Sequence, residues 1–195
     1  MMLKIDGLDV EVSGLAVATI PLFIKDRFGE KGFERWLSKL EPEIQEIYKG
    51  VISVNKWFDI KKVFIKPTEM LCDIFYKGDI KAAWEFGRFS ADYGLKGVLK
   101  VFVKLASVNY FINRASVVIP NYYTPMSMDV ITNEKGYAVL QIPHFPGIHK
   151  IVEYRIGGWM ERALEITGNT KDLDVKITKS LADGDDYTEF EVKWS

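Results

Sequence analysis

The chain has 195 residues, 48% of them hydrophobic, which suffices for one buried core but leaves little for a second independent one. Lysine and arginine number 26 against 27 aspartate and glutamate, so the net charge of −1 gives no bulk attraction to nucleic acid or to an anionic membrane. We expect a single domain over residues 1–195 that binds no nucleic acid.

Three features bear on where the protein works. The longest apolar runs, such as residues 14–24, have about half of the roughly 20 residues that a membrane span requires. Residues 1–12 lack the basic start, apolar middle and small-residue cleavage site of a secretory signal. Cys72 is the single cysteine, so the chain forms no internal disulfide. We expect a cytoplasmic protein without a membrane span.

The first half of the chain has the pattern of helices. A short strand is expected around residues 8–12, and Pro21 lies in the helical stretch that follows, either in a first turn or at a kink. Residues 30–50 carry apolar side chains at steps of three and four. This helical stripe continues past Pro42 and stops at Gly50.

Consecutive helices are also expected over residues 66–106. Gly78 breaks this run, and Asp79 is suited to cap the helix after the break. Ser107 is suited to cap a further helix. That helix should stop before Pro120, because the residue before a proline is disfavoured in the helical region.

The pattern then changes to strands. Residues 126–142 contain two apolar, β-branched runs around the turn NEKG, which predicts an antiparallel hairpin. Residues 174–194 predict a second hairpin around ADGDD, with Phe190, Val192 and Trp194 on the inward face of its last strand. The order of helices, hairpin, helix and hairpin indicates an α+β fold with an antiparallel sheet.

One long amphipathic helix is predicted between the hairpins, over residues 147–168, with Gly168 as its carboxy-terminal cap. Its apolar face consists of Val152, Ile156, Trp159, Met160, Ala163 and Ile166. Gly157 and Gly158 lie inside this helix. Each costs about 1 kcal/mol relative to alanine, so we expect another backbone or a ligand to approach closely there.

The sequence shows no catalytic or metal-binding constellation. Cys72 lies in an apolar helical face, where a thiol is a buried hydrophobe with a raised pKa. His144 and His149 flank a Pro-Gly break, which is not the spacing of a zinc-binding pair. The acidic turn at 183–186 lacks the distal glutamate of the common calcium loop, and no phosphate-binding glycine loop occurs. We expect no catalytic residue, no metal and no cofactor.

Aromatic residues and two arginines stand out instead. The aromatic side chains either form a solid core or line a preformed apolar cavity for a hydrophobic small molecule. Arg88 and Arg114 lie in apolar helical stretches, where a buried guanidinium requires a carboxylate from the protein or from a ligand; the alternative is an exposed position. The candidate pocket residues are Trp57, Trp84, Phe86, Arg88, Phe89, Phe102, Tyr110, Phe111, Arg114 and Trp159.

Three stretches, residues 84–97, 153–168 and 175–194, carry a family resemblance. In this order and spacing they resemble the 4-vinyl reductase domain, a related myxobacterial family of sensory domains and, more remotely, haem nitric-oxide-binding domains and TRAPP vesicle-tethering subunits. The resemblance implies an α+β fold in which helices pack on a twisted antiparallel sheet, here formed largely by the carboxy-terminal hairpins. It also implies a sensory or regulatory role.

The resemblance also bears on metal and haem. Some relatives carry cysteines in the final hairpin that are proposed to bind metal, and Ser180 and Thr188 occupy those positions here. Haem-binding relatives use a proximal histidine and a YxSxR motif. That motif does not occur in this chain, and YRIGG at 154–158 is no substitute. The resemblance therefore implies neither a metal nor haem.

We expect a non-enzymatic ligand-binding or sensory domain that holds an apolar or aromatic small molecule, or an acyl chain, between helices and sheet. Because the sequence leaves no room for an output domain, it is expected to signal through a partner protein or as a homodimer. The first alternative is a scaffold or interaction module acting as a dimer. A haem or gas sensor and an enzyme are disfavoured, the enzyme because no set of nucleophile, base and orienter occurs.

Overall fold

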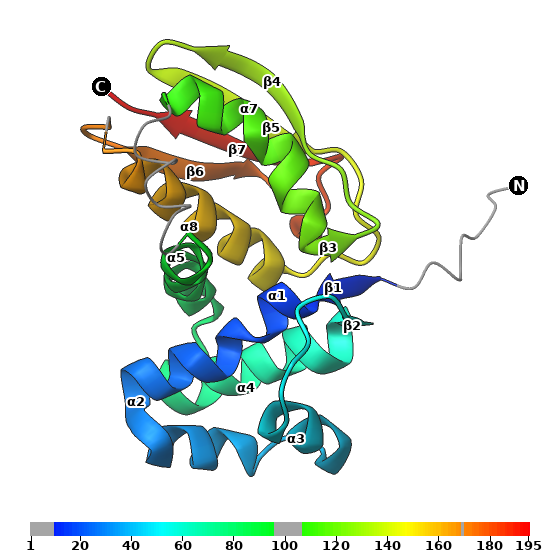
Figure 1. Cartoon of the computed structure of the whole chain (residues 1–195). Coiled ribbons are helices and arrows are strands. Elements are labelled where there is room, and N and C mark those ends of the chain that lie inside the picture. The colour runs from blue at the N-terminus through cyan, green and yellow to red at the C-terminus, as the bar shows by residue number, and fades with distance from the viewer. Residues whose placement is uncertain (1–9, 96–106, 169) are drawn as a thin grey trace, which may run out of the picture.

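The computed structural model describes residues 10–95, 107–168 and 170–195 (Figure 1). A four-stranded antiparallel sheet lies at one end of the molecule. Its strands are β4 (Asp129–Glu134), β5 (Tyr137–Ile142), β6 (Asp174–Lys179) and β7 (Thr188–Lys193), in the order β4-β5-β7-β6. The two predicted hairpins therefore form this sheet and meet through β5 and β7.

Helices α7 (Val108–Val118) and α8 (Lys150–Ile166) cover one face of the sheet, and α5 (Ala83–Gly94) packs against α8 from the other side (Figure 1). The end opposite the sheet consists of α1 (Gly14–Val17), α2 (Thr19–Leu37), α3 (Pro42–Lys49) and α4 (Lys66–Phe75). Short turns connect these elements: a π-helical turn at Lys61–Ile65 and 3₁₀ turns at Ile80–Ala82, Ile119–Asn121 and Leu181–Asp183. The predicted α+β architecture is confirmed.

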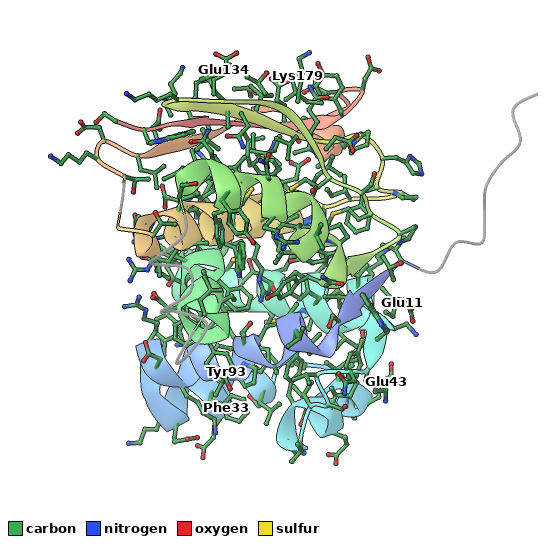
Figure 2. The ribbon with its side chains drawn as sticks, turned by 45° about the horizontal axis from the view of Figure 1, so that its top comes forward. Glu11, Phe33, Glu43, Tyr93, Glu134 and Lys179 are labelled. Atoms are coloured by element: carbon green, nitrogen blue, oxygen red, sulfur yellow. The ribbon has the colours of Figure 1, made fainter. Side chains whose placement is uncertain are left out.

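The alternation in β7 separates the core from solvent. Phe190 and Val192 are fully buried, while Lys193 is exposed and Trp194, just after the strand, is half-buried. In Figure 2, Glu134 and Lys179 mark the sheet end of the molecule, opposite Phe33 and Glu43. A single cluster of buried side chains extends from the first strand to β7. In the described part of the chain, no helix is long and apolar enough to cross a membrane.

The predicted helix boundaries agree with the structure where local chemistry determines them. Pro21 lies in the first turn of α2. Asp79 accepts a hydrogen bond from the backbone N–H of Lys81 at 3.0 Å, just before α5, and Ser107 accepts one from Tyr110 at 3.2 Å. Gly168 has φ +70° after the end of α8, which is the left-handed conformation of a helix cap.

Two features of the amino-terminal half differ from the expectation. A small sheet has the order β2 (Trp57–Asp59), β1 (Glu11–Ser13) and β3 (Tyr123–Thr124). β1 overlaps the strand expected at 8–12, whereas β2 and β3 were not predicted, because strands of two or three residues show no alternation. The apolar stripe over 30–50 is divided: α2 ends at Leu37 and Pro42 begins α3. The start of the strand expected at 8–12, and the end of the helical run expected to 106, lie outside the described residues.

Candidate ligand site

An arginine is buried where α2, α5 and α8 meet. Arg155, on α8, is 3% exposed. Its Nη2 donates to the carbonyl oxygen of Ala16 at 3.0 Å, to Thr19 Oγ1 at 2.7 Å and to Ser90 Oγ at 2.9 Å. All three acceptors are neutral, so they satisfy hydrogen-bond donors without balancing the positive charge.

The Arg155 guanidinium lies over aromatic rings rather than beside a carboxylate. Its central carbon is 3.9 Å from the ring centroid of Phe86 and 4.6 Å from that of Phe64. No carboxylate among the described residues is paired with it. Burial lowers the pKa of Arg155 from its ordinary value, because desolvation disfavours the charged form.

Two buried donors in the described ranges have no hydrogen-bond partner: Arg155 Nη1 and Trp159 Nε1. Both residues line the same cavity of about 10 Å³. Its other walls are Ile119, Tyr122, Tyr123 and Ile156. This volume is about the minimum for one water molecule, so the cavity beside these two residues has room for a single small group.

A second cavity of about 10 Å³ lies between α7, α8 and the sheet. It is lined by Phe111, Ile112, Ala115, Leu140, Trp159, Met160, Leu164 and Val192. Trp159 lines both cavities, and its indole is stacked on Phe111 with ring centroids 6.2 Å apart. The described part of this interface is therefore close-packed and encloses no space that would hold an acyl chain without a side chain moving.

Three glycines bring α5 and α8 into close contact. A Cβ on Gly158 would lie 2.0 Å from the carbonyl oxygen of Trp84, and one on Gly157 would lie 2.3 Å from its indole. On the facing helix, a Cβ on Gly87 would lie 2.2 Å from the carbonyl oxygen of Arg155. The expected approach of another backbone at the glycine pair is confirmed, and it brings side chains of α5 onto the buried guanidinium.

Arg88 lies at the outer edge of the contact between α5 and α8, with its side chain 32% exposed. It hydrogen-bonds to Glu161 and donates two bonds of 2.9 Å to the two carboxylate oxygens of Glu165. Trp84 Nε1 donates to the same Glu161 at 2.9 Å. Of the alternatives for Arg88, the structure shows a carboxylate partner from the protein, and these bonds raise the pKa of Arg88.

The other candidate pocket residues are dispersed. Arg114 and Tyr110 are exposed on α7, where the guanidinium lies 3.3 Å from the tyrosine hydroxyl, so Arg114 takes the exposed alternative. Trp57, in β2, is 38% exposed. Phe89 is half-buried on α5, and Phe102 lies outside the described residues. Trp159 and Phe111 lie together in the helix–sheet interface, while Phe86 packs on Arg155.

Glu153, two residues before Arg155 on α8, is fully buried and fully hydrogen-bonded. It accepts bonds from Ser180 Oγ at 2.6 Å, Thr188 Oγ1 at 2.5 Å and the backbone N–H of Ala182 at 3.3 Å. The two positions that the resemblance associated with metal-binding cysteines therefore face one carboxylate. Within the described residues, no group of three or more histidine, cysteine, aspartate or glutamate side chains could hold a metal ion.

The cysteine and the histidines lie away from this interface. Cys72 is fully buried in α4, and burial together with nearby carboxylates raises its pKa to about 12. His144 is exposed. His149 caps α8 by accepting a hydrogen bond from the backbone N–H of Ile151 at 3.2 Å, and its Nε2 lies 3.4 Å from a carboxylate oxygen of Glu69. The thiol is therefore a buried hydrophobe, as predicted.

Sequence reasoning missed Arg155, although a signal for it existed. Arg155 falls between Val152 and Trp159 at steps of three and four, so it lies on the predicted apolar face of its helix. A charged residue at such a position is either exposed at the edge of the helix or buried with specific partners. Arg88 and Arg114 have apolar neighbours in the sequence, whereas the residues that surround Arg155 come from α1, α2 and α5.

The fold is that of H-NOX domains. An H-NOX protein from S. oneidensis in the Fe(II)NO ligation state matches with a TM-score of 0.73 and 13% identity over 94% of this chain and 99% of that one. The H-NOX protein from K. algicida matches with a TM-score of 0.69 and 9% identity over 94% and 96%. No known family model and no curated protein matches the chain by sequence, so the resemblance to 4-vinyl reductase domains stays a prediction.

The described residues do not fit a haem group. A ligand pocket of drug-like size has about 300–1,000 Å³, whereas the two cavities that Trp159 lines have about 10 Å³ each. An open groove of about 570 Å³ beside His149 combines apolar walls with the charged side chains of Asp59, Lys61, Lys66 and Glu69. His149 is not free to bind iron there, because its Nδ1 caps α8 and its Nε2 lies 3.4 Å from Glu69. Residues 96–106 contain no histidine, cysteine, methionine or tyrosine that could be an axial ligand.

Proposed function

We propose that this chain, which has the fold of H-NOX domains, is a non-enzymatic sensory domain of the cytoplasm that binds an apolar or aromatic small molecule between its helices and its sheet. The observation that carries the proposal is the position of Trp159. Its indole lies between two cavities and has ring contacts to Phe111 and Tyr122, while its Nε1 has no hydrogen-bond partner among the described residues.

A rotation of the Trp159 side chain joins the two cavities into one site. Aromatic and aliphatic side chains form most of the walls of that site. Each methylene of a ligand buried there contributes about 0.8 kcal/mol, which compensates for the loss of the ring contacts of Trp159. The ligand thus selects a conformation in which the indole is displaced.

The proposed site is connected to both layers of the fold. Leu140 of β5 and Val192 of β7 line the second cavity, so a ligand there contacts the sheet as well as α7 and α8. A displacement of α8 reaches the sheet through Glu153, which hydrogen-bonds to Ser180 and Thr188. We propose that a partner protein or a second copy of the chain senses this displacement.

Native mass spectrometry of the protein purified from its own host tests the proposal. The expected result is a defined added mass on the folded protein. Ala115→Phe fills the second cavity, which Ala115 lines, and should abolish that mass. Val117→Phe, on the exposed side of the same helix, is the matched control and should retain it.

Two results contradict the proposal. Protein of the apo mass from the native host, or an added mass that persists in Ala115→Phe, shows that the ligand is absent or bound elsewhere. Circular dichroism of both variants establishes that they are folded, because overpacking a core costs about 1–3 kcal/mol. An absorbance band of haem in the purified protein would replace this proposal by haem sensing.

An interaction module is the second candidate, favoured by an exposed apolar surface around the small sheet. Leu15 is 43% exposed, Val54 46% and Trp57 38%. These residues lie close together, since β1 pairs with β2 and Ser13 Oγ hydrogen-bonds to the carbonyl oxygen of Val54. Light scattering at micromolar concentration should show a dimer that Trp57→Ser dissociates; a monomeric wild-type protein excludes self-association through this surface.

A further inference from the structure

Arg155 has the features of a recognition group for an acid. We infer that the molecule bound at the Trp159 site carries a carboxylate, or another acidic group of similar size, which pairs with Arg155 Nη1 and Trp159 Nε1. The inference rests on the proposed function and names the chemical class of the ligand. It stands on the hydrogen bonds, burial and cavity of the described residues.

The buried charge of Arg155 is not balanced within the described residues. Arg155 Nη2 is fully used by Ala16, Thr19 and Ser90, but these neutral acceptors leave the guanidinium with its full positive charge. The aromatic rings of Phe64 and Phe86 attract the guanidinium without neutralising its charge. A buried charge without a counter-ion is strongly unfavourable. An anion that enters the site therefore binds where the protein already holds an unbalanced charge.

The two donors without partners belong to neighbouring residues of one helix face. The unpartnered Arg155 Nη1 and Trp159 Nε1 belong to residues one helical turn apart on α8, and both residues line the same cavity. A carboxylate has two oxygens that accept such donors, whereas a single apolar group would leave both donors unsatisfied. The body of the ligand then extends past Trp159 towards the apolar cavity lined by Phe111 and Leu140.

An acidic group differs in its charge from other occupants of the cavity. A water molecule fits a volume of about 10 Å³ and accepts from both donors, but it leaves the charge unbalanced. No described carboxylate of the protein is paired with Arg155. Tyr122 and Tyr123 also line the cavity, and burial raises the pKa of both hydroxyls, which keeps them neutral. An acidic ligand is the occupant that supplies the missing charge.

Two probes with the same carbon skeleton test the inference: 3-phenylpropionate and 3-phenylpropan-1-ol, titrated calorimetrically into wild type, Arg155→Met and Arg114→Met. The acid should bind wild type about tenfold more tightly than the alcohol, as a charge-assisted pair predicts. Arg155→Met should bind the two probes equally. Arg114→Met, which removes an exposed arginine, should keep the wild-type preference.

Arg155→Lys is the second variant, because it keeps the charge if the methionine variant does not fold, and it should retain a preference for the acid. Equal binding of both probes by wild type, or a preference for the acid that persists in Arg155→Met, overturns the inference. If both probes bind equally and Ala115→Phe abolishes both, the apolar site stands and only its acid recognition fails. If neither probe binds wild type, the proposed site fails together with the inference.

Discussion

Helix α8 buries two residues of opposite charge, two positions apart, in different ways. Glu153 faces the sheet, where two hydroxyls and a backbone N–H donate to its carboxylate, and Lys150 Nζ lies 3.5 Å from one of its oxygens. Arg155 faces the helices. Its Nη2 donates hydrogen bonds to neutral acceptors, and its Nη1 has no partner among the described residues. The difference shows that Glu153 joins α8 to the final hairpin, whereas Arg155 has no counter-ion among the described residues.

The largest effect is expected from removing the carboxylate. Glu153→Ala leaves the hydroxyls of Ser180 and Thr188 buried without their acceptor, and should lower the free energy of unfolding by about 3–5 kcal/mol. Urea denaturation measures this loss. Glu34→Ala, which removes an exposed carboxylate on α2, is the control and should change the stability by no more than about 0.5 kcal/mol. A loss below about 1 kcal/mol in Glu153→Ala would show that the contact is dispensable.

The next largest effect concerns the contact that covers Arg155 from the side of α5. Gly158→Ala should cost about 3 kcal/mol, because its Cβ would lie 2.0 Å from the backbone oxygen of Trp84. Gly94→Ala, at the end of α5, is the matched control. The nearest atom to its Cβ, the hydroxyl oxygen of Tyr122, is 3.6 Å away, so thermal unfolding should show an unchanged or slightly higher Tm. Equal stability of the two variants would contradict the close approach of the helices.

Arg155→Met should not lower the free energy of unfolding, in contrast to Glu153→Ala. Thr19 and Ser90 keep partners after the substitution, because they lie 3.1 Å from each other and donate to the carbonyl oxygens of Ala16 and Phe86. Removing an unbalanced buried charge should then leave the free energy of unfolding unchanged or raise it by about 1 kcal/mol. The same urea titration measures it. A large loss would mean that the guanidinium is a structural group like Glu153.

A small loss of stability is expected at the arginine that pairs with two glutamates of α8. Arg88→Met should lower the free energy of unfolding by about 1 kcal/mol near pH 7, since its side chain and that of Glu165 are each 32% exposed. Although burial opposes it, hydrogen bonds from Arg88 and Arg162 lower the pKa of Glu165 below its ordinary value of 4.5. This contribution is present above that value and is lost as the pH falls through the lowered pKa.

The stability contributed by Arg88 should depend on pH, because its partner Glu165 titrates. The difference in stability between wild type and Arg88→Met should stay constant from neutral pH down to about pH 5 and shrink below 4.5, as Glu165 becomes protonated. Unfolding curves at a series of pH values measure it. A difference that does not change with pH would assign the effect to packing of the arginine stem rather than to its charge.

Local chemistry made the carboxy-terminal half predictable. NEKG and ADGDD determine the two hairpins, and alternation determines that Phe190 and Val192 face the core. The glycine pair indicated a close approach, and Trp84 supplies it. The small sheet could not be predicted in the same way, because the short strands around Phe58 and Tyr123 gain their regularity only by pairing with distant β1.

The candidate site was predicted only in part. Phe111 and Trp159 were expected at the interface, and the structure brings them together there. Arg88 and Arg114 had the right sequence context for a buried charge, yet one is paired at a helix edge and the other is exposed. Their burial depends on which helix covers them, and that information is not local.

The sequence by itself determined the order of helices and hairpins, the caps at Asp79 and Ser107, and the inward face of α8, because all of these follow from periodicity and from side chains close in the chain. Only the tertiary structure decided which hydrogen-bond partners the two buried charges of α8 meet. Glu153 meets residues 27 and 35 positions away and Arg155 meets residues 65 and 136 positions away. Partners at such separations become neighbours only when the layers pack, and so the fold leaves Arg155 without a counter-charge in its described part.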